Sequence, residues 1–132
     1  MSSLSFRKFS PRDTPQIVNL LKIFKVPITI EEWEWFVLKN PDGQSRVYIA
    51  YTNENNIVGV CGYFPVLIKV GKESYKGGYG HHLMLSTEFR DTVSYIQFSN
   101  YQIKCEKEFG TEWFIGPPNP SSYKPHKILM KW

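Results

Sequence analysis

Two adjacent histidines, His81 and His82, are the residues of this sequence best suited to proton transfer. Imidazole has an ordinary pKa of about 6.5, so it can accept or donate a proton near neutral pH. The residues around the pair predict a β-strand, in which neighbouring side chains point to opposite faces. We therefore expect one histidine to face a ligand cleft and the other to pack or to meet solvent.

Other chemistry-bearing motifs are weak. Cys61 and Cys105 lack the spacing of a metal site, and we interpret them as two reduced, buried thiols. No zinc-ligand set, Ser/His/Asp order or pair of carboxylates in one apolar setting stands out, so no metal is expected. The glycine-rich residues 77–80 precede a strand rather than a helix, which favours a bulge or a crowded backbone over a phosphate loop.

The composition fits one globular domain that spans residues 1–132. Hydrophobic residues make up 42% of the chain and charged residues 21%, which argues against disorder. The formal net charge of +4 is compatible with a phosphate-bearing ligand, but it is too small to predict a nucleic-acid partner. The longest apolar run, residues 57–68, is too short to cross a bilayer, and the first ten residues do not resemble a signal peptide. We expect a cytoplasmic protein without a membrane partner.

The first half of the chain predicts a strand followed by two helices. Residues 4–9 alternate as a strand does, and Asp13 and Pro15 predict the start of a helix over 15–24. Thr29 and Glu32 form a capping-box pattern at the start of a second helix. One side of that helix is expected to carry four apolar residues: Ile30, Trp33, Phe36 and Val37.

The second half predicts mainly strands, over residues 46–52, 57–64, 66–70 and 79–85. A helix is expected from about Val93 to Phe109, closed by Gly110. A short buried strand over 112–116, a proline-rich loop over 117–120 and a last helix over 121–130 complete the chain. This order predicts the α+β class, with an antiparallel sheet packed on helices.

The order of elements resembles that of the GNAT superfamily of acyl-CoA-dependent N-acyltransferases. Residues 6–13 (FRKFSPRD) resemble the opening strand and helix entry of many members. The sequence WEW at 33–35, with Asn40-Pro41, resembles the second helix of one bacterial branch, and residues 116–123 (GPPNPSSY) with Trp132 resemble that branch's segment after the fifth strand. The resemblance implies a mixed, mostly antiparallel central sheet flanked by about four helices.

The resemblance also implies direct transfer of an acyl group from acetyl-CoA, or another acyl-CoA, to a small-molecule amine. Backbone donors on the fourth strand, here Leu83, Met84 and Leu85, would polarise the thioester carbonyl. His82 occupies the place of the base, and either His126 or Tyr123 the place of the acid that protonates the thiolate. Asn119 and Ser122 correspond to residues near the CoA arm. Trp33, Trp35 and Phe36 either line the amine pocket or belong to the core.

One loop departs from the family pattern. Members bind the CoA diphosphate on a glycine-rich loop between the fourth strand and the third helix, where backbone amides approach the phosphates. The corresponding cofactor-binding residues here have no glycine: Arg90, Asp91, Thr92, Val93, Ser94 and Tyr95. The Asp91 carboxylate would repel a phosphate, and capping of the next helix by Asp91 or Thr92 is the alternative explanation.

Family members also continue past the fourth helix with two further strands, whereas this sequence stops at Trp132. Either the chain is a fragment, or another subunit of a homo-oligomer covers the open sheet edge. Two functions follow from these observations. One is an acetyl-CoA-dependent N-acetyltransferase, and the other is a non-catalytic GNAT-fold binding or assembly module that has lost CoA binding.

Overall fold

The computed structural model describes residues 4–41 and 43–116. Its centre is one sheet of five strands in the order β1-β2-β3-β4-β5. Strands β1 to β4 are antiparallel to their neighbours, and β5 runs parallel to β4. Their bounds are β1 Ser5–Lys8, β2 Arg46–Tyr51, β3 Ile57–Val70, β4 Glu73–Leu85 and β5 Trp113–Ile115.

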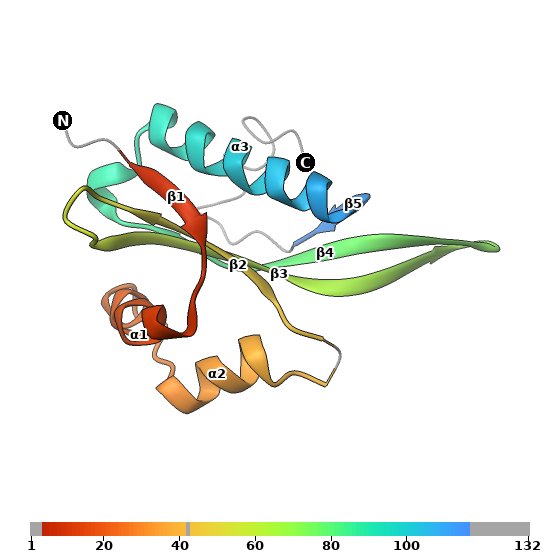
Figure 1. The fold of residues 1–132 in the computed structure, drawn as a ribbon, viewed down its shortest axis with the longest axis horizontal. Helices are drawn as coiled ribbons and strands as arrows, with labels where there is room; N and C mark the ends of the chain where they lie inside the picture. Colours follow the sequence, from red (N-terminus) through yellow and green to blue (C-terminus); the bar gives the residue numbers. More distant parts are fainter. Residues whose placement is uncertain (1–3, 42, 117–132) are drawn as a thin grey trace.

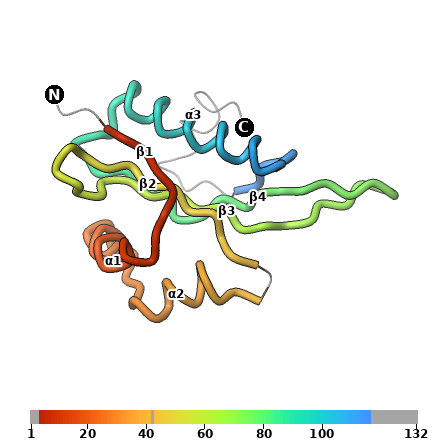
Figure 2. The backbone as a smooth tube through the Cα atoms, viewed as in Figure 1, coloured from red at the N-terminus to blue at the C-terminus, as the bar shows by residue number. Residues whose placement is uncertain are grey.

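Three α-helices cover the sheet: α1 Thr14–Ile23, α2 Ile30–Leu38 and α3 Thr92–Phe109. Helices α1 and α2 lie on one face and α3 on the other, while the far end of the β3–β4 hairpin projects beyond the helices (Figures 1 and 2). Short 3₁₀ turns precede α1 and α3, at Pro11–Asp13 and Thr87–Phe89. The predicted α+β class with a mostly antiparallel sheet is confirmed. The predicted loop over 117–120 and helix over 121–130 lie outside the described residues.

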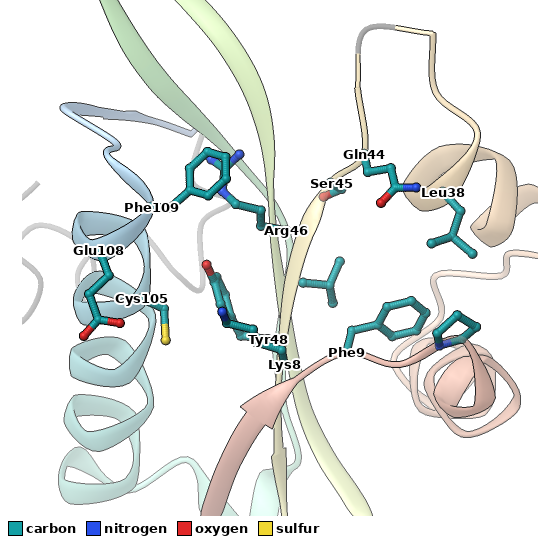
Figure 3. Close-up of a pocket in the computed structure, with 12 residues that line it drawn as sticks. Lys8, Phe9, Leu38, Gln44, Ser45, Arg46, Tyr48, Cys105, Glu108 and Phe109 are labelled. Atoms are coloured by element: carbon teal, nitrogen blue, oxygen red, sulfur yellow. The ribbon is translucent and has the colours of Figure 1, made fainter.

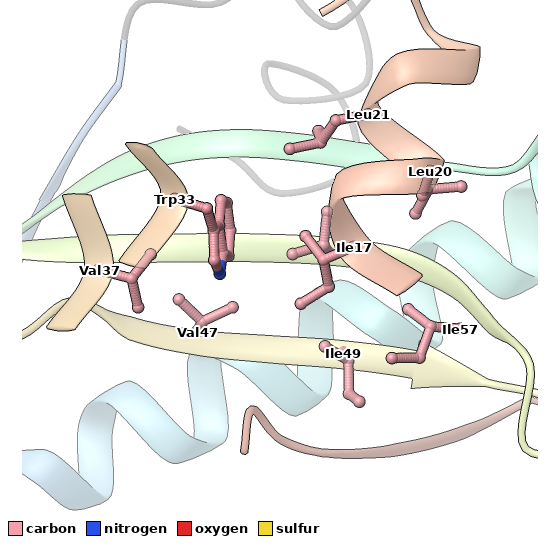
Figure 4. Packing of buried hydrophobic residues seen from close by; sticks show 9 residues of the cluster. Ile17, Leu20, Leu21, Trp33, Val37, Val47, Ile49 and Ile57 are labelled. Atoms are coloured by element: carbon pink, nitrogen blue, oxygen red, sulfur yellow. The ribbon is translucent and has the colours of Figure 1, made fainter. Parts of the chain in front are cut away.

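Each face of the sheet has its own hydrophobic cluster. Ile17, Leu21, Trp33 and Val37 of α1 and α2 pack on Ile49 and its neighbours in β2 and β3 (Figure 4). On the opposite face, residues of α3 pack on the sheet in a second cluster, whose buried members are Tyr48, Ala50, Cys61, Tyr63, Leu85, Phe89 and Phe98. Helices thus pack on both faces of β2, β3 and the C-terminal part of β4.

The predicted capping box of α2 is confirmed. The Glu32 amide donates to Thr29 Oγ1 over 3.0 Å, and the Thr29 amide donates to Glu32 Oε1 over 3.2 Å. Trp33 and Val37 are fully buried, whereas Ile30 is 45% exposed, so the apolar side of this helix is not buried along its whole length. It lies in the first turn, where the helix extends past the edge of the core.

Asp13 precedes α1 as predicted, but its side chain does not cap that helix. The carboxylate accepts hydrogen bonds from the Arg7 guanidinium at 2.8 and 2.9 Å and from the Ser10 amide at 2.8 Å. It therefore joins β1 to the turn before α1.

The two strands predicted over 57–64 and 66–70 are one strand, β3, that runs through Pro65. Strand β2 ends its pairing at Tyr63, so beyond that residue β3 is an edge strand on one side. An edge strand tolerates proline, because no ladder hydrogen bond is required there. The prediction of a break at Pro65 is therefore wrong.

Strand β4 begins at Glu73, six residues before the predicted start at Tyr79. The glycines explain the difference, since the crowding alternative holds: a Cβ on Gly77 would lie 2.7 Å from Ile68 Cδ1, and one on Gly78 would lie 3.0 Å from Glu106 Oε1. The bulge of this strand is elsewhere. Val60 pairs with Met84 and Gly62 with His81, so two residues of β4, His82 and Leu83, oppose one residue of β3.

Helix α3 is anchored by a fully buried carboxylate, Glu106. Arg46 donates to both its oxygens at 2.7 Å, Tyr48 donates at 2.5 Å and Thr111 donates at 3.0 Å. Gly110 ends the helix with φ at +105°, as its sequence position predicts. Among the described helices, none is long and apolar enough to span a membrane.

Candidate active site

The two histidines lie on the same face of β4, where α2 packs. Ring centroids of both are 5.3 Å from that of Phe36, and the two Nδ1 atoms are 2.8 Å apart. The expectation that they face opposite ways is wrong. The bulge explains this, because His82 adopts a left-handed backbone conformation, with φ at +51°, and interrupts the alternation of side chains.

His81 lies flat across the sheet. Its ring stacks on Phe64, with centroids 4.2 Å apart and an interplanar angle of 21°. It covers Gly62 on the neighbouring strand, where a Cβ would lie 2.3 Å from the ring. Its Nε2 is 2.5 Å from the hydroxyl of Ser45, the residue just before β2. The ring therefore contacts Phe64 and Gly62 and has a hydrogen-bond partner at each nitrogen.

Burial keeps both imidazoles neutral near physiological pH. Desolvation, with a smaller contribution from His82, lowers the pKa of His81 to about 3. Desolvation also lowers the pKa of His82, which packs edge-on against the buried Trp33 at 5.6 Å. A neutral imidazole is the form that can act as a general base.

His82 lines an open cleft of about 930 Å³ between the α1–α2 connection and α2. The His82 Nδ1 atom is engaged by His81, so Nε2 is the ring nitrogen available to a bound molecule. Trp35 and Phe36 contribute aromatic surface, and Trp35 is 53% exposed. The charged residues of the cleft are three carboxylates and one ammonium: Glu31, Glu32, Glu34 and Lys39.

The predicted aromatic residues divide between the two expected roles. Trp35 and Phe36 line the cleft, whereas Trp33 is fully buried in the core and meets His82 from behind. We name the space lined by His82, Trp35 and the α2 glutamates the His82 cleft.

A second cleft, of about 670 Å³, lies at the other edge of the sheet. Figure 3 shows Phe9, Gln44 and Leu38 on one side of β2 and the α3 residues Cys105 and Phe109 on the other. It opens where β1 ends. Among the residues that the structure describes, its lining includes no histidine and none of the predicted site residues, so the His82 cleft is the better candidate for acyl-transfer chemistry.

The predicted diphosphate loop begins α3, and Asp91 caps this helix. Its carboxylate accepts from the Ser94 amide at 2.9 Å and from the Ser94 hydroxyl at 2.8 Å. These hydrogen bonds lower the pKa of Asp91, so the carboxylate is charged near neutral pH. Thr92 is the first residue of α3 rather than its cap, and Val93 is 63% exposed. A negative charge therefore occupies the helix end at which a phosphate would be attracted.

Arg90, the cation of the same loop, makes its contacts within the protein. Its Nε donates to the Leu85 carbonyl over 2.8 Å, and its guanidinium lies 4.7 Å from the centroid of the Phe24 ring. The side chain joins the end of β4 to the end of α1.

Strands β4 and β5 diverge. Pairing with β5 covers only Gly77, Gly78 and Tyr79 of β4, so on this side residues 80–85 have no strand partner within the described part of the chain. This stretch includes Leu83, Met84 and Leu85, the predicted backbone donors. Strand β5 is more open than predicted, since Trp113 is 50% and Ile115 41% exposed.

The arrangement of elements is shared with solved acetyltransferases. An acetyltransferase of Trypanosoma brucei superposes with a TM-score of 0.75 and 13% identity over 96% of this chain and 91% of its own. An aminoglycoside 6′-N-acetyltransferase of Acinetobacter baumannii gives 0.75 and 12% over 96% and 89%. Glucosamine-6-phosphate N-acetyltransferase of Arabidopsis thaliana gives 0.67 and 15% over 91% and 85%.

This chain has the GNAT fold. The structural likeness confirms the fold implied by the sequence resemblance. The sequence identities are too low to indicate which substrate this chain uses. No family model matches the sequence, and no curated protein matches it either.

Within the GNAT fold, the predicted site residues fall into three groups. His82 and the donors of β4 lie at the bulge and at the unpaired edge beside it. In the loop, Asp91 and Ser94 bond to each other at the start of α3, whereas Arg90 contacts Leu85 and Phe24. The remaining candidates, Asn119, Ser122, Tyr123 and His126, lie outside the described residues.

Sequence reasoning missed Ser45 and the cleft carboxylates. Ser45 lies 36 residues before His81, and no local pattern links a serine after a helix to a distant strand. Glu31 lies inside the capping box, in the first turn of α2, where an acidic residue is already explained by the helix dipole. Glu34 lies one turn further on, and no local pattern marks it as part of a site. Among the described residues, no group of three potential ligands could hold a metal ion.

Proposed function

We propose that this chain is an N-acyltransferase that moves an acyl group from acyl-CoA directly to a primary amine. One observation carries the proposal: the neutral imidazole of His82 opens into an acidic and aromatic cleft beside the unpaired edge of β4. Acyl transfer requires a base, an amine-binding surface and backbone donors, for which His82, the cleft and the edge of β4 are the proposed sources.

The charges of the His82 cleft support a cationic amine as acceptor. Glu31, Glu32 and Glu34 outnumber the one positive side chain, Lys39, although Glu32 also serves the α2 cap. Carboxylates attract an ammonium group, and the exposed ring of Trp35 offers a face for a cation. We infer an acceptor with a second positive charge besides the reacting amine.

His82 is the proposed base of the transfer. Nε2 accepts a proton from the amine as its nitrogen attacks the thioester carbonyl, the N–C bond forms and the C–S bond breaks. Donors among Leu83, Met84 and Leu85 stabilise the charge on the carbonyl oxygen. The departing thiolate takes its proton from His126 or Tyr123, which keep the roles implied by the family resemblance.

Acyl-CoA is a substrate in this proposal. The structure suits its pantetheine arm better than its diphosphate. The unpaired edge of β4 over residues 80–85 suits an extended pantetheine arm, which can hydrogen-bond as a strand does. The start of α3 does not suit a diphosphate, because Asp91 occupies the Ser94 amide and Arg90 is held by Leu85. We therefore expect weak CoA binding, with the diphosphate displaced from the helix end.

The capped start of α3 also favours the second candidate, a binding or assembly module that has lost CoA. Calorimetric titration with acetyl-CoA and with CoA separates the two. The acyltransferase predicts saturable heat for both, whereas absence of heat and of thermal stabilisation at millimolar ligand rejects it.

The catalytic roles are tested by thiol release with primary amines of one, two and three positive charges. His82→Gln should lower kcat about 100-fold or more, the usual contribution of a general base. Glu34→Gln should raise KM most for the multiply charged amines. Glu108→Gln, a matched change in the second cleft, should alter neither constant. Equal rates for His82→Gln and the unmodified chain would contradict the role of His82.

A further inference from the structure

Behind His82, three side chains form one hydrogen-bonded chain. The Ser45 hydroxyl lies 2.5 Å from His81 Nε2, and His81 Nδ1 lies 2.8 Å from His82 Nδ1. The chain starts in the segment between α2 and β2 and ends at the His82 cleft. Ser45 lies 36 residues from His81 in sequence, so only the fold brings it to the histidine pair.

The position of the middle ring is fixed by the sheet. Phe64 stacks on His81, and Gly62 leaves room for the ring where any larger residue would collide with it. Phe36 contacts both histidines edge-on at 5.3 Å. The bulge at His82 then brings the two Nδ1 atoms together instead of placing them on opposite faces.

This geometry restricts the protons. Two nitrogens 2.8 Å apart share one hydrogen, so one Nδ1 donates and the other accepts. Burial keeps both rings neutral, and each neutral ring carries one N–H. Only two arrangements of protons satisfy all three side chains.

In the first arrangement, Ser45 donates to His81, His81 donates to His82, and His82 carries its proton on Nε2. In the second, His82 Nδ1–H donates to His81 Nδ1, His81 Nε2–H donates to Ser45 Oγ, and His82 Nε2 is unprotonated. Ser45 also borders the second cleft, so in the second arrangement its own hydrogen can be donated to water.

We propose that Ser45 and His81 are positioning residues that hold His82 in the second arrangement, with the lone pair of Nε2 directed to the acceptor amine. The proposal rests on the proposed function, in which His82 is the base. When Nε2 takes a proton, His82 Nδ1–H becomes a charged donor to His81, and this hydrogen bond strengthens. The charged groups that face His82 across the cleft are Glu31, Glu32, Glu34 and Lys39, and the neutral, titratable His81 is its hydrogen-bond partner.

The protonation of each ring nitrogen is measured by ¹⁵N–¹H NMR correlation spectra of the histidine rings in the whole chain at pH 7.5. We expect His82 to be protonated on Nδ1 alone and His81 on Nε2 alone. A proton on Nε2 of His82 in the unmodified chain overturns the proposal.

Three variants test the chain of hydrogen bonds. Ser45→Ala removes the acceptor of the His81 Nε2–H hydrogen bond. His81→Phe keeps an aromatic ring stacked on Phe64 but removes the hydrogen bond to His82. Both should shift the His82 proton toward Nε2 and lower kcat about tenfold or more with KM within twofold, because a base held in the wrong tautomer cannot accept the proton. Ser45→Thr keeps the hydroxyl and should restore both the tautomer and most of the rate.

The results separate this inference from the proposed function. If His82→Gln abolishes thiol release while Ser45→Ala and His81→Phe leave the tautomer and kcat unchanged, the positioning roles are wrong and the acyltransferase stands. If the NMR spectra show the expected tautomer but no amine is acylated, the proposed function fails and the hydrogen-bonded chain stands.

Discussion

At the scale of single residues, the histidine pair is costly to ionise. His81 contacts aromatic rings on several sides and has no carboxylate among its hydrogen-bond partners. A positive charge on its ring would be shielded from water and would lie close to His82. Neutral, hydrogen-bonded imidazoles are the stable form, which is also the form that base catalysis requires.

This cost makes the stability of the fold depend on pH. The pKa of His81 is about 3 in the folded chain and about 6.5 when unfolded, so below pH 6.5 the unfolded chain binds the proton first. As the pH is lowered below 6.5, the free energy of unfolding should decrease by up to about 1.4 kcal/mol per pH unit for each such histidine. Urea unfolding between pH 7.5 and about 5, where most carboxylates remain ionised, measures this slope.

The double variant His81→Phe/His82→Gln is the comparison. It should show a flatter dependence over the same pH range, because it has no buried imidazole to keep neutral. Equal slopes for the variant and the unmodified chain would show that neither histidine is buried as described.

At the scale of elements, the start of α3 bears on the proposed binding of CoA. Asp91 does two things there: it caps the helix through Ser94, and it places a negative charge at the helix end. The two effects are separable, since asparagine also caps helices but carries no charge.

Asp91→Asn should therefore keep the helix cap and tighten acetyl-CoA binding about fivefold, the size of a charge repulsion over a few ångströms in water. Asp91→Ala also removes the charge, but it should lower the melting temperature as well. Titration calorimetry and thermal unfolding measure the two effects. The gain in affinity should shrink at high salt, and a salt-independent gain would contradict a charge effect.

At the scale of the whole molecule, a buried ion pair between Glu106 and Arg46 joins α3 to the sheet, in addition to the hydrophobic cluster on that face. Glu106→Ala should lower the free energy of unfolding by about 3 kcal/mol, because it leaves the Arg46 guanidinium and the Tyr48 hydroxyl without their acceptor. Glu108→Ala, on the exposed side of the same turn, should change it by less than about 0.5 kcal/mol. Similar losses in both variants in urea unfolding would argue against a special role for Glu106.

The outer end of the sheet bears on self-association. Leu67 and Val70 of β3 are 63% and 56% exposed, and Trp113 of β5 is 50% exposed. Exposed apolar strands near a sheet edge favour pairing with another chain. The homo-oligomer therefore stays a prediction, to be checked by sedimentation over a range of concentrations. A monomer at every concentration would refute it, and Leu67→Lys should weaken any association observed.

Local patterns in the sequence determined much of this fold. The capping box at Thr29 and the glycine after Phe109 fixed helix ends, because each acts through backbone groups within one turn. Alternation predicted the first strand, residue types and turn residues predicted the others with errors at Pro65 and Tyr79, and the order of elements resembled that of the GNAT fold. His82 could be singled out because few side chains titrate near neutral pH.

Only the tertiary structure decided what surrounds His82. The bulge that turns both histidines to one face depends on the register of β4 against β3, and the Ser45 contact depends on two strands that are far apart in sequence. The same holds for Glu106, whose place in a helix does not reveal that Arg46 and Tyr48 approach it from β2. Hydrogen bonds between distant segments form only after the chain packs, so the sequence singled out His82 and the fold supplied its partners.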